Sequence, residues 1–403
     1  MLKNIYKPDI TYPAIIALLF SSFIYLEHFG ITCKILNTVF ALISLYLFLH
    51  VSKKAVLLSG FLIGLLWFYW VGYSFEYNGV GFLTPFVTLG FALLITLFFA
   101  ALAFTKEVYI RALLLFILSF VEPFDFNWMQ IELIFVDSYI GVQKYQLVLV
   151  LIALALPTYI KKPYMYASLL LILLAVNYSP KEQKDSPLKI KLVETKIAQD
   201  IKWTRQHLEP TIKLIYQEIE KAKQEKYEVV VLPESVFPLF MNRAPRIIQQ
   251  LQLLSYDITI IAGTLLYEDE KNYNVTYMFN KGNYEIAKKL VLVPFGEYIP
   301  LPKFMRKVIN EYFFAGASDF KTATHPTDFT IEGTKFRNAI CFEATCQEVY
   351  EGDVDFIIAS SNNAWFTPSI EPTLQKLLLR FYARKNGVTV YHSANWAGTG
   401  VIK

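Results

Sequence analysis

The sequence predicts an α-helical membrane domain that crosses the bilayer several times, followed by an α/β domain. The composition is that of a membrane protein, because 55% of the 403 residues are hydrophobic and the mean hydropathy is +0.38. Charged residues are sparse from residue 8 to residue 178, and beyond residue 189 strand-like runs alternate with amphipathic segments, which is typical of a layered α/β domain. We therefore expect a membrane domain, a polar linker and a globular domain at residues 1–178, 179–188 and 189–403.

Seven apolar segments occur in the first domain, and each predicts a membrane-spanning helix. A helix needs about 20 residues to cross the hydrocarbon core, and the fifth and seventh segments are short by that measure. The first segment has no small-residue cleavage site after it, so it is not expected to be a removable signal peptide. The segments cover residues 12–28, 34–50, 55–74, 82–104, 108–121, 144–160 and 164–178.

The charges between these segments predict how the domain is oriented. Connections rich in Lys and Arg remain in the cytoplasm, and here they alternate with acidic connections. The amino terminus is therefore expected inside, and an odd number of spans places the chain from residue 179 onward outside. The basic connections contain Lys3, Lys7, Lys53, Lys54, Lys106, Arg111, Lys161 and Lys162, and the others contain Glu27, Glu76, Glu122, Asp125, Glu132 and Asp137.

The long connection at residues 122–143 is too apolar for a free loop. Its aromatic residues include Phe124, Phe126 and Trp128. Two interpretations remain open for it. One is a belt of aromatic side chains at the membrane surface, the other is a re-entrant lid above a lipid-binding cavity, and the two are compatible.

Hydrophobic periodicity predicts the elements of the globular domain. Two amphipathic helices are expected at residues 208–224 and 373–386, where apolar residues recur at helical spacing. A hairpin that turns at Lys281–Asn283 is expected between strands at residues 273–280 and 285–292. Further strands are expected at residues 189–193, 227–232, 258–266, 336–342, 355–359 and 388–392.

Three polar residues of the globular domain stand at or near the ends of strand-like runs: Glu234, Lys289 and Cys341. A cysteine thiol is mostly protonated near pH 7, so it needs a base or a positive neighbour to act as a nucleophile. A glutamate can take that proton, and a lysine can stabilise the thiolate and the oxyanion that follows. Taken singly, each residue is also compatible with a structural role, since a lone cysteine in an apolar run is usually a small core residue.

The order Glu, Lys, Cys behind a membrane domain resembles the bacterial apolipoprotein N-acyltransferases, whose globular part is of the nitrilase type. The resemblance extends from the first membrane segment almost to the end of the chain, and it includes the run Gly296-Glu297-Tyr298-Ile299-Pro300. It implies an α-β-β-α nitrilase-like sandwich. It also implies Glu234 as general base, Lys289 as charge stabiliser and Cys341 as nucleophile.

The resemblance also implies supporting residues. Glu297 and Glu343 match positions that would steady the catalytic lysine and the substrate amine, and Trp203 matches a tryptophan at the substrate entrance. The family more often has tyrosine and aspartate where this chain has Phe342 and Asn363. The family also continues through further strands and a last transmembrane helix, so the globular domain is expected to be short at its carboxyl end.

The activity implied by the resemblance is acyl transfer between two lipids. The acyl donor is a membrane phospholipid, and Cys341 carries the acyl chain as a thioester. The acceptor is the amino group of a diacylglyceryl-modified cysteine at the amino terminus of an apolipoprotein. The chain is then expected to be a monomer embedded in the bacterial inner membrane, with its catalytic domain in the periplasm. Two alternatives remain: a membrane-tethered amidase, and a non-catalytic scaffold with a degenerate nitrilase domain.

The composition argues against several other classes. The net charge of +4 shows no basic cluster, so no nucleic-acid partner is expected. Three cysteines are too few for a disulfide framework. The five histidines show no metal-ligand spacing, and no glycine-rich phosphate loop occurs. Neither a metal nor another cofactor is therefore expected.

Overall fold

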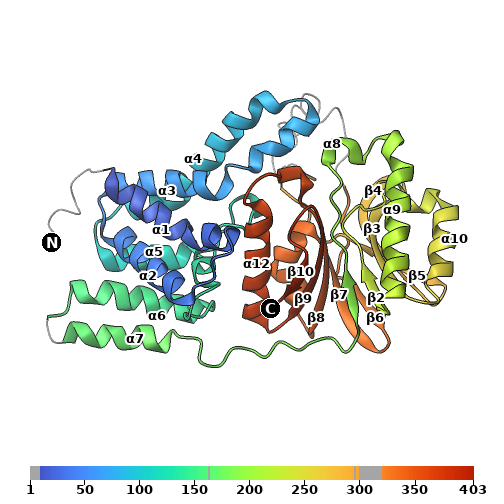
Figure 1. Cartoon of the computed structure of the whole chain (residues 1–403). Helices are drawn as coiled ribbons and strands as arrows, with labels where there is room; N and C mark the ends of the chain where they lie inside the picture. Colours follow the sequence, from blue (N-terminus) through green and yellow to red (C-terminus); the bar gives the residue numbers. More distant parts are fainter. Residues whose placement is uncertain (1–9, 162–163, 295, 299–319) are drawn as a thin grey trace. The chain divides into compact units, whose positions relative to one another are not determined.

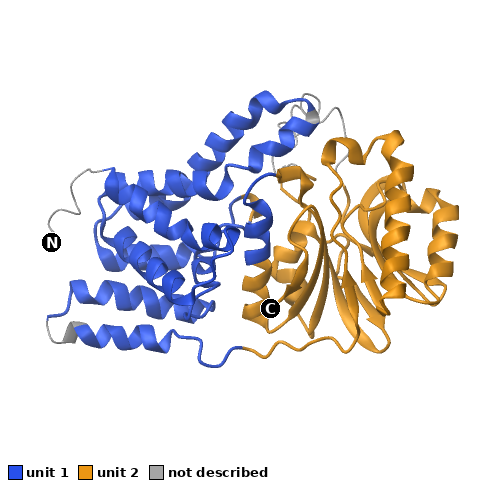
Figure 2. Cartoon of the chain, in the orientation of Figure 1, with its two compact units in different colours: residues 1–123, 127–180, 368–377 blue, residues 124–126, 181–367, 378–403 orange. Residues whose placement is uncertain are grey.

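The computed structural model describes residues 10–161, 164–294, 296–298 and 320–403. These residues form two compact units (Figure 2). Unit 1 comprises Met1–Pro123, Asn127–Pro180 and Pro368–Leu377, and unit 2 comprises Phe124–Phe126, Lys181–Thr367 and Leu378–Lys403.

Unit 1 is helical, and an α-helix occurs in each of the seven apolar segments (Figure 1). Among the described residues, Gly81–Ala103 is by itself long and apolar enough to cross a membrane, and Lys53–Phe68 with Val71–Tyr77 is a second candidate bent by 44°. The expectation of seven spans therefore stays a prediction. The α-helices are α1 (Thr11–His28), α2 (Lys34–His50), α3 (Lys53–Phe68), α4 (Thr84–Ala103), α5 (Val108–Leu118), α6 (Lys144–Ala155) and α7 (Ser168–Leu174).

Small residues let α3 and α4 pack closely. A Cβ atom added to Gly64 of α3 would lie 2.8 Å from the Cα atom of Ala92 on α4, and one added to Gly60 would lie 3.2 Å from Thr96 Cα. Glycine at such positions permits the close backbone approach that helices use inside membranes.

Arg111 of α5 is fully buried, although the sequence suggests a charge near the cytoplasmic surface. Its guanidinium donates hydrogen bonds of 2.6–3.1 Å to backbone carbonyl oxygens at the ends of neighbouring helices, which are those of Leu49, Val51, Leu102 and Thr105. A buried cation is tolerated only where such acceptors surround it. Arg111 therefore holds together the connections between the helices.

The connection at residues 122–143 is mostly packed inside the protein. Trp128, Ile131 and Phe135 are buried, whereas Phe124 and Tyr139 are about half exposed. The buried Glu132 forms an ion pair of 2.6 Å with Lys144, which the belt interpretation does not predict. An aromatic belt at the membrane surface is therefore wrong for the greater part of this segment. It contains two 3-10 turns, η4 (Pro123–Asp125) and η5 (Ile131–Phe135).

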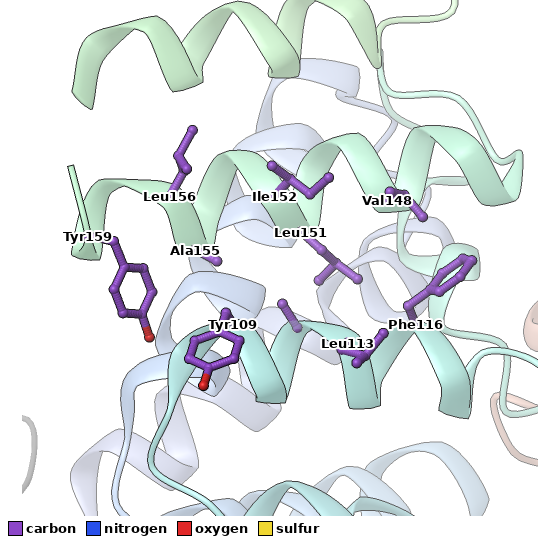
Figure 3. Close-up of a pocket in the computed structure, with 10 residues that line it drawn as sticks. Tyr109, Leu113, Phe116, Val148, Leu151, Ile152, Ala155, Leu156 and Tyr159 are labelled. Atoms are coloured by element: carbon purple, nitrogen blue, oxygen red, sulfur yellow. The ribbon is translucent and has the colours of Figure 1, made fainter. Parts of the chain in front are cut away.

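An apolar groove runs between α5 and α6 (Figure 3). Its volume is about 410 Å³. Tyr109 and Tyr159 lie at one end and Phe116 and Val148 at the other, and the lining carries almost no polar surface. In a membrane domain, a surface of this kind is suited to contact with lipid hydrocarbon.

Unit 2 contains two five-stranded sheets. The first sheet has the order β1-β2-β3-β4-β5, and the second has the order β10-β9-β8-β7-β6. Parallel pairs form the middle of the second sheet, where β7, β8 and β9 run side by side. The strands are β1 (Ile190–Leu192), β2 (Val229–Val231), β3 (Thr259–Glu268), β4 (Lys271–Asn280), β5 (Asn283–Lys288), β6 (Asp328–Ile331), β7 (Thr334–Ile340), β8 (Phe356–Asn362), β9 (Thr389–Asn395) and β10 (Gly400–Ile402).

The two sheets face each other across a shared core. Val231 and Ile261 of the first sheet cluster with Phe336 and Ile358 of the second. The other face of the first sheet is covered by α9 (Arg205–Gln224) and α10 (Pro245–Leu254), as Figure 1 shows. The alternation of apolar residues along β2 explains this arrangement, because Val230 joins the helix-side core and Val231 the core between the sheets.

The predicted hairpin is confirmed. β4 and β5 pair antiparallel with Asn280 opposite Asn283, so the turn lies at Lys281 and Gly282. The helix predicted at residues 208–224 is α9, and the one at 373–386 is α12 (Glu371–Asn386). The sequence did not predict α10, β6 or β10, of which the two strands are only four and three residues long.

Candidate active site

The three predicted catalytic residues each follow the end of a strand. Glu234 comes after β2 and Lys289 directly after β5, both in the first sheet. Cys341 comes directly after β7 of the second sheet. The structure brings them together, because Glu234 and Cys341 both interact electrostatically with the Lys289 ammonium.

Lys289 is the centre of the charged cluster. Its side chain is fully buried, and its Nζ atom lies 2.7 Å from Glu297 Oε2 and 3.9 Å from Glu234 Oε1. Burial alone would lower the pKa of Lys289, but the carboxylates of Glu297 and Glu234 outweigh burial and raise it. Lys289 therefore remains a cation at any physiological pH.

Asn274 of β4 joins the two carboxylates. Its Nδ2 atom donates to Glu234 Oε1 at 2.7 Å and lies 3.3 Å from Glu297 Oε1. Its backbone carbonyl accepts the Lys289 amide at 2.9 Å. One strand residue thus fixes the relative positions of both glutamates and the lysine backbone. The sequence pattern alone does not single out Asn274.

The turn that carries Glu234 depends on a glycine in the neighbouring strand. A Cβ atom added to Gly263 of β3 would lie 2.7 Å from Glu234 Cα and 2.6 Å from the Ser235 nitrogen. Only glycine permits so close an approach of two backbones. Ser235 itself has a φ of +47°, so the chain turns sharply after the predicted base.

Cys341 stands at a strained junction between a strand and a helical turn. It begins η9 (Cys341–Thr345) with a φ of +56°, a conformation that costs free energy in a residue with a side chain and is often found at functional sites. Its side chain is partly exposed, whereas Cys346 is buried with its thiol 3.5 Å from the Phe342 carbonyl oxygen. Of the two cysteines, Cys341 is therefore the one placed to meet a substrate.

Glu343 holds the backbone around the site. Its Oε1 accepts the Ile340 amide at 2.6 Å, and its Oε2 accepts the amides of Leu290 and Val291 at 2.5 and 3.1 Å. Burial raises the pKa of Glu343 to about 7, although Lys289 and these three donors act in the opposite direction. In the described part of the chain, both of its oxygens are thus engaged with backbone that flanks the cysteine and the lysine.

An aromatic contact lies next to the nucleophile. Phe342 is buried and stacks on Phe126, with ring centroids 6.2 Å apart and planes 11° apart. The neighbouring Asp125 accepts a hydrogen bond of 3.1 Å from the Tyr298 hydroxyl. Residues 124–126 are therefore tied to unit 2 by a stacked ring and a hydrogen bond beside Cys341.

Trp203 is the remaining predicted site residue. It caps the carboxyl end of α8 (Gln199–Lys202) and is 45% exposed. An exposed indole on a short turn is consistent with a position at a site entrance. The adjacent Lys202 is fully buried, and no sequence pattern singles it out.

A buried glutamate–lysine pair, a strained strand-end cysteine and two facing sheets define a hydrolase of the carbon–nitrogen type, here behind a helical membrane domain. The comparisons agree. Residues 7–178 match the apolipoprotein N-acyltransferase integral membrane domain, and residues 197–402 match the carbon-nitrogen hydrolase model.

Relatives of similar length show the family to which the chain belongs. The chain is 41% identical to the apolipoprotein N-acyltransferase of Wolinella succinogenes, over 96% of this chain and 94% of that protein. It is 35% identical to those of Helicobacter pylori and Campylobacter jejuni, over 91% and 94% of this chain and 87% and 86% of theirs. The chain belongs to the apolipoprotein N-acyltransferase family.

Proposed function

We propose that the protein moves an acyl chain from a membrane phospholipid to the amino group of a diacylglyceryl-cysteine at the amino terminus of an apolipoprotein. Family membership supports lipoprotein N-acylation as the activity. The observation that carries the mechanism is the buried cluster in which the Lys289 ammonium lies 2.7 Å from Glu297 and 3.9 Å from Glu234 and interacts with Cys341. This cluster supplies a base, a fixed positive charge and a nucleophile in one place.

The first half-reaction forms a thioester. The Glu234 carboxylate takes the thiol proton, and Cys341 Sγ attacks the carbonyl carbon of the phospholipid ester. Lys289 stabilises the negative charge of the tetrahedral intermediate. The bond between the carbonyl carbon and the alcohol oxygen then breaks, and the leaving lysophospholipid takes the proton from Glu234.

The second half-reaction consumes the thioester. The neutral amino group of the apolipoprotein attacks the thioester carbonyl carbon, and its surplus proton passes to Glu234. The carbon–sulfur bond breaks, an amide is formed, and the Cys341 thiolate takes the proton from Glu234, which restores the starting state. Two steps through one covalent intermediate suit two bulky lipid substrates, because they need not occupy the site at the same time.

The surroundings of the cysteine support an apolar substrate. Phe342 and Phe126 form a stacked pair beside it, and Trp203 is exposed close in sequence to the buried Lys202. We further propose that the membrane domain spans the bilayer seven times, that unit 2 is an α-β-β-α sandwich in the periplasm, and that the enzyme works as a monomer.

Mass spectrometry of Cys341 tests the proposal. After incubation of the detergent-solubilised protein with one defined phospholipid, the peptide that contains Cys341 should gain the mass of one acyl chain, and lysophospholipid should appear. The Cys341→Ala variant should show neither product, and Cys346→Ala should show both, because Cys346 is buried. An adduct on Cys346, or turnover by Cys341→Ala, would contradict the mechanism.

The acceptor is tested in a second step. Addition of a synthetic diacylglyceryl-cysteine peptide should remove the adduct and give the N-acylated peptide. If the thioester persists in the presence of this peptide while simple amides are hydrolysed, the membrane-tethered amidase becomes the better assignment.

A further inference from the structure

Unit 2 contains a second buried lysine close to the proposed base. Lys202 is 0% exposed, and its Nζ atom donates to the backbone carbonyl oxygen of Glu234 at 3.1 Å. The Asn362 carboxamide lies 3.2 Å away and accepts from the same ammonium when its oxygen faces Lys202. Within the described residues, Lys202 has no carboxylate in ion-pair contact. Such burial is costly unless other charges compensate for it.

The strand register places these groups at the edge of the sheet where Cys341 stands. β7 and β8 run parallel with Ile340 opposite Ser360, so Cys341 follows β7 at the level of Ser361, one residue before Asn362 at the end of β8. The Asn362 side-chain amide in turn lies 2.8 Å from that of Asn395, which is its partner in β9.

The same edge binds the segment that carries Lys202. Asn395 Oδ1 accepts from the Thr195 hydroxyl at 2.8 Å and from the Ile197 amide at 2.9 Å, and the side-chain amides of Gln199 and Asn362 lie 2.8 Å apart. This polar network fixes the path of the chain into α8. Side chains of the second sheet therefore hold Lys202 in place, while its ammonium contacts the backbone of Glu234, the proposed base, next to the first sheet.

A count of charges gives the reason for a second cation. Ionised Glu234 and Glu297 carry two negative charges against the one positive charge of Lys289, and the buried Glu343, whose pKa burial raises to about 7, adds part of a third negative charge. Transfer of the proton from Cys341 to Glu234 does not change that total. Burial lowers the pKa of Lys202 to about 8, and the charges of Glu234 and Cys341 oppose that effect, so at neutral pH the ammonium offsets one negative charge of the cluster.

We propose that Lys202 is a positioning residue for the acyl transfer, which fixes the Glu234 turn and stabilises the Cys341 thiolate through its positive charge. The inference rests on the proposed function, because it concerns the nucleophile of that reaction. Lys289 also holds the two carboxylates of Glu297 and Glu234, so a second cation adds to the stabilisation that Lys289 gives the thiolate.

Alkylation of the full-length protein by iodoacetamide across a pH series tests the proposal without any lipid. The three cysteines of one molecule serve different purposes when their peptides are followed by mass spectrometry. Cys341 reports the nucleophile, the exposed Cys33 is an ordinary thiol for reference, and the buried Cys346 reports loss of the fold. The variants are Lys202→Met and Lys202→Gln, and the exposed Lys196→Met is the matched control.

In both Lys202 variants, iodoacetamide should alkylate Cys341 about tenfold more slowly at pH 7 than in the wild type. The pH at which the rate is half-maximal should rise by about one unit, and the rate at high pH should be unchanged. Lys196→Met should match the wild type. If Lys202→Gln restores the wild-type profile, Lys202 acts only as a hydrogen-bond donor, and the electrostatic role is overturned.

The controls separate the failure of this proposal from that of the proposed function. If Cys341 of the wild type reacts no faster than Cys33 at pH 7, the thiol is not activated and the proposed mechanism fails. If Cys341 is activated and both Lys202 variants match the wild type, only the role of Lys202 fails. A variant that exposes Cys346 to alkylation is unfolded, and the comparison is then made with the other variant.

Discussion

At the scale of single residues, two buried lysines of one site have opposite electrostatic surroundings. Lys289 has two carboxylates within 4 Å, and these raise its pKa. Lys202 bonds a backbone carbonyl oxygen, and burial lowers its pKa to about 8. The first is therefore a permanent charge, whereas the second titrates close to neutral pH. A site with both can keep one charge fixed while the other responds to its surroundings.

The charged partners of Cys341 should each be needed for the thioester. Glu234→Gln leaves no base for the thiol proton, and Lys289→Ala removes the charge beside the oxyanion, so each should slow formation of the acyl-enzyme on the order of a hundredfold or more. Lys289→Arg should not restore the rate, because the wider guanidinium directs its charge differently. The measurement is the rate of acyl-adduct formation on Cys341 with excess phospholipid.

Glu268→Gln provides a control for these variants. Glu268 forms an ion pair with Lys288, next to Lys289 in sequence but on the surface, so its loss should leave the rate unchanged. If Glu234→Gln or Lys289→Ala forms the thioester at the normal rate, that residue has only a structural role.

At the scale of elements, the sequence predicts best where a local pattern decides the structure. The hairpin at Lys281–Gly282 and the helix α9 follow from turn residues and helical spacing, and both are present. Contacts between distant segments were not predictable in this way. Glu343 binds amides that lie more than 50 positions away, and Lys202 of α8 meets Asn362 at the end of β8. Residue type alone cannot reveal such pairings.

His392 of β9 links β8 to the loop between β9 and β10 and should make the stability of unit 2 depend on pH. It is fully buried, with Nε2 2.8 Å from Ser361 Oγ and Nδ1 2.9 Å from the Gly398 carbonyl oxygen. Burial lowers the pKa of His392 from 6.5 to about 4. The unfolded chain therefore binds a proton at higher pH than the folded one, so the contribution is complete above pH 6.5 and is lost as the pH falls toward 4.

The size of this effect can be measured by thermal unfolding in detergent at pH 7.5 and pH 5. The shift predicts a loss of about 2 kcal/mol at pH 5, and of about 3 kcal/mol once titration is complete. His392→Gln should show a smaller decrease in melting temperature between the two pH values, whereas the exposed His325→Gln should behave as the wild type. An equal decrease in all three proteins would show that His392 does not control the pH response.

At the scale of the whole molecule, a membrane domain and a hydrolase-type domain share one chain. The integral membrane model matches residues 7–178, and the carbon-nitrogen hydrolase model matches residues 197–402. A soluble hydrolase needs no such domain, whereas an enzyme with two lipid substrates gains from being held at the bilayer. The proposed acyl transfer therefore requires the active site to lie on the side of the membrane where its lipid substrates are present.

The orientation predicted from the loop charges tests that agreement. Lys53, Lys54 and Lys106 are expected in the cytoplasm, and seven spans then place everything after residue 179 outside. Alkaline phosphatase fused after Lys189 should be active and green fluorescent protein fused there should be dark, because each folds on only one side of the membrane. Fusions after Lys53 should give the opposite result. If the Lys189 fusion reports the cytoplasm, Cys341 cannot meet an exported lipoprotein, and the amidase would replace the acyltransferase as the proposed activity.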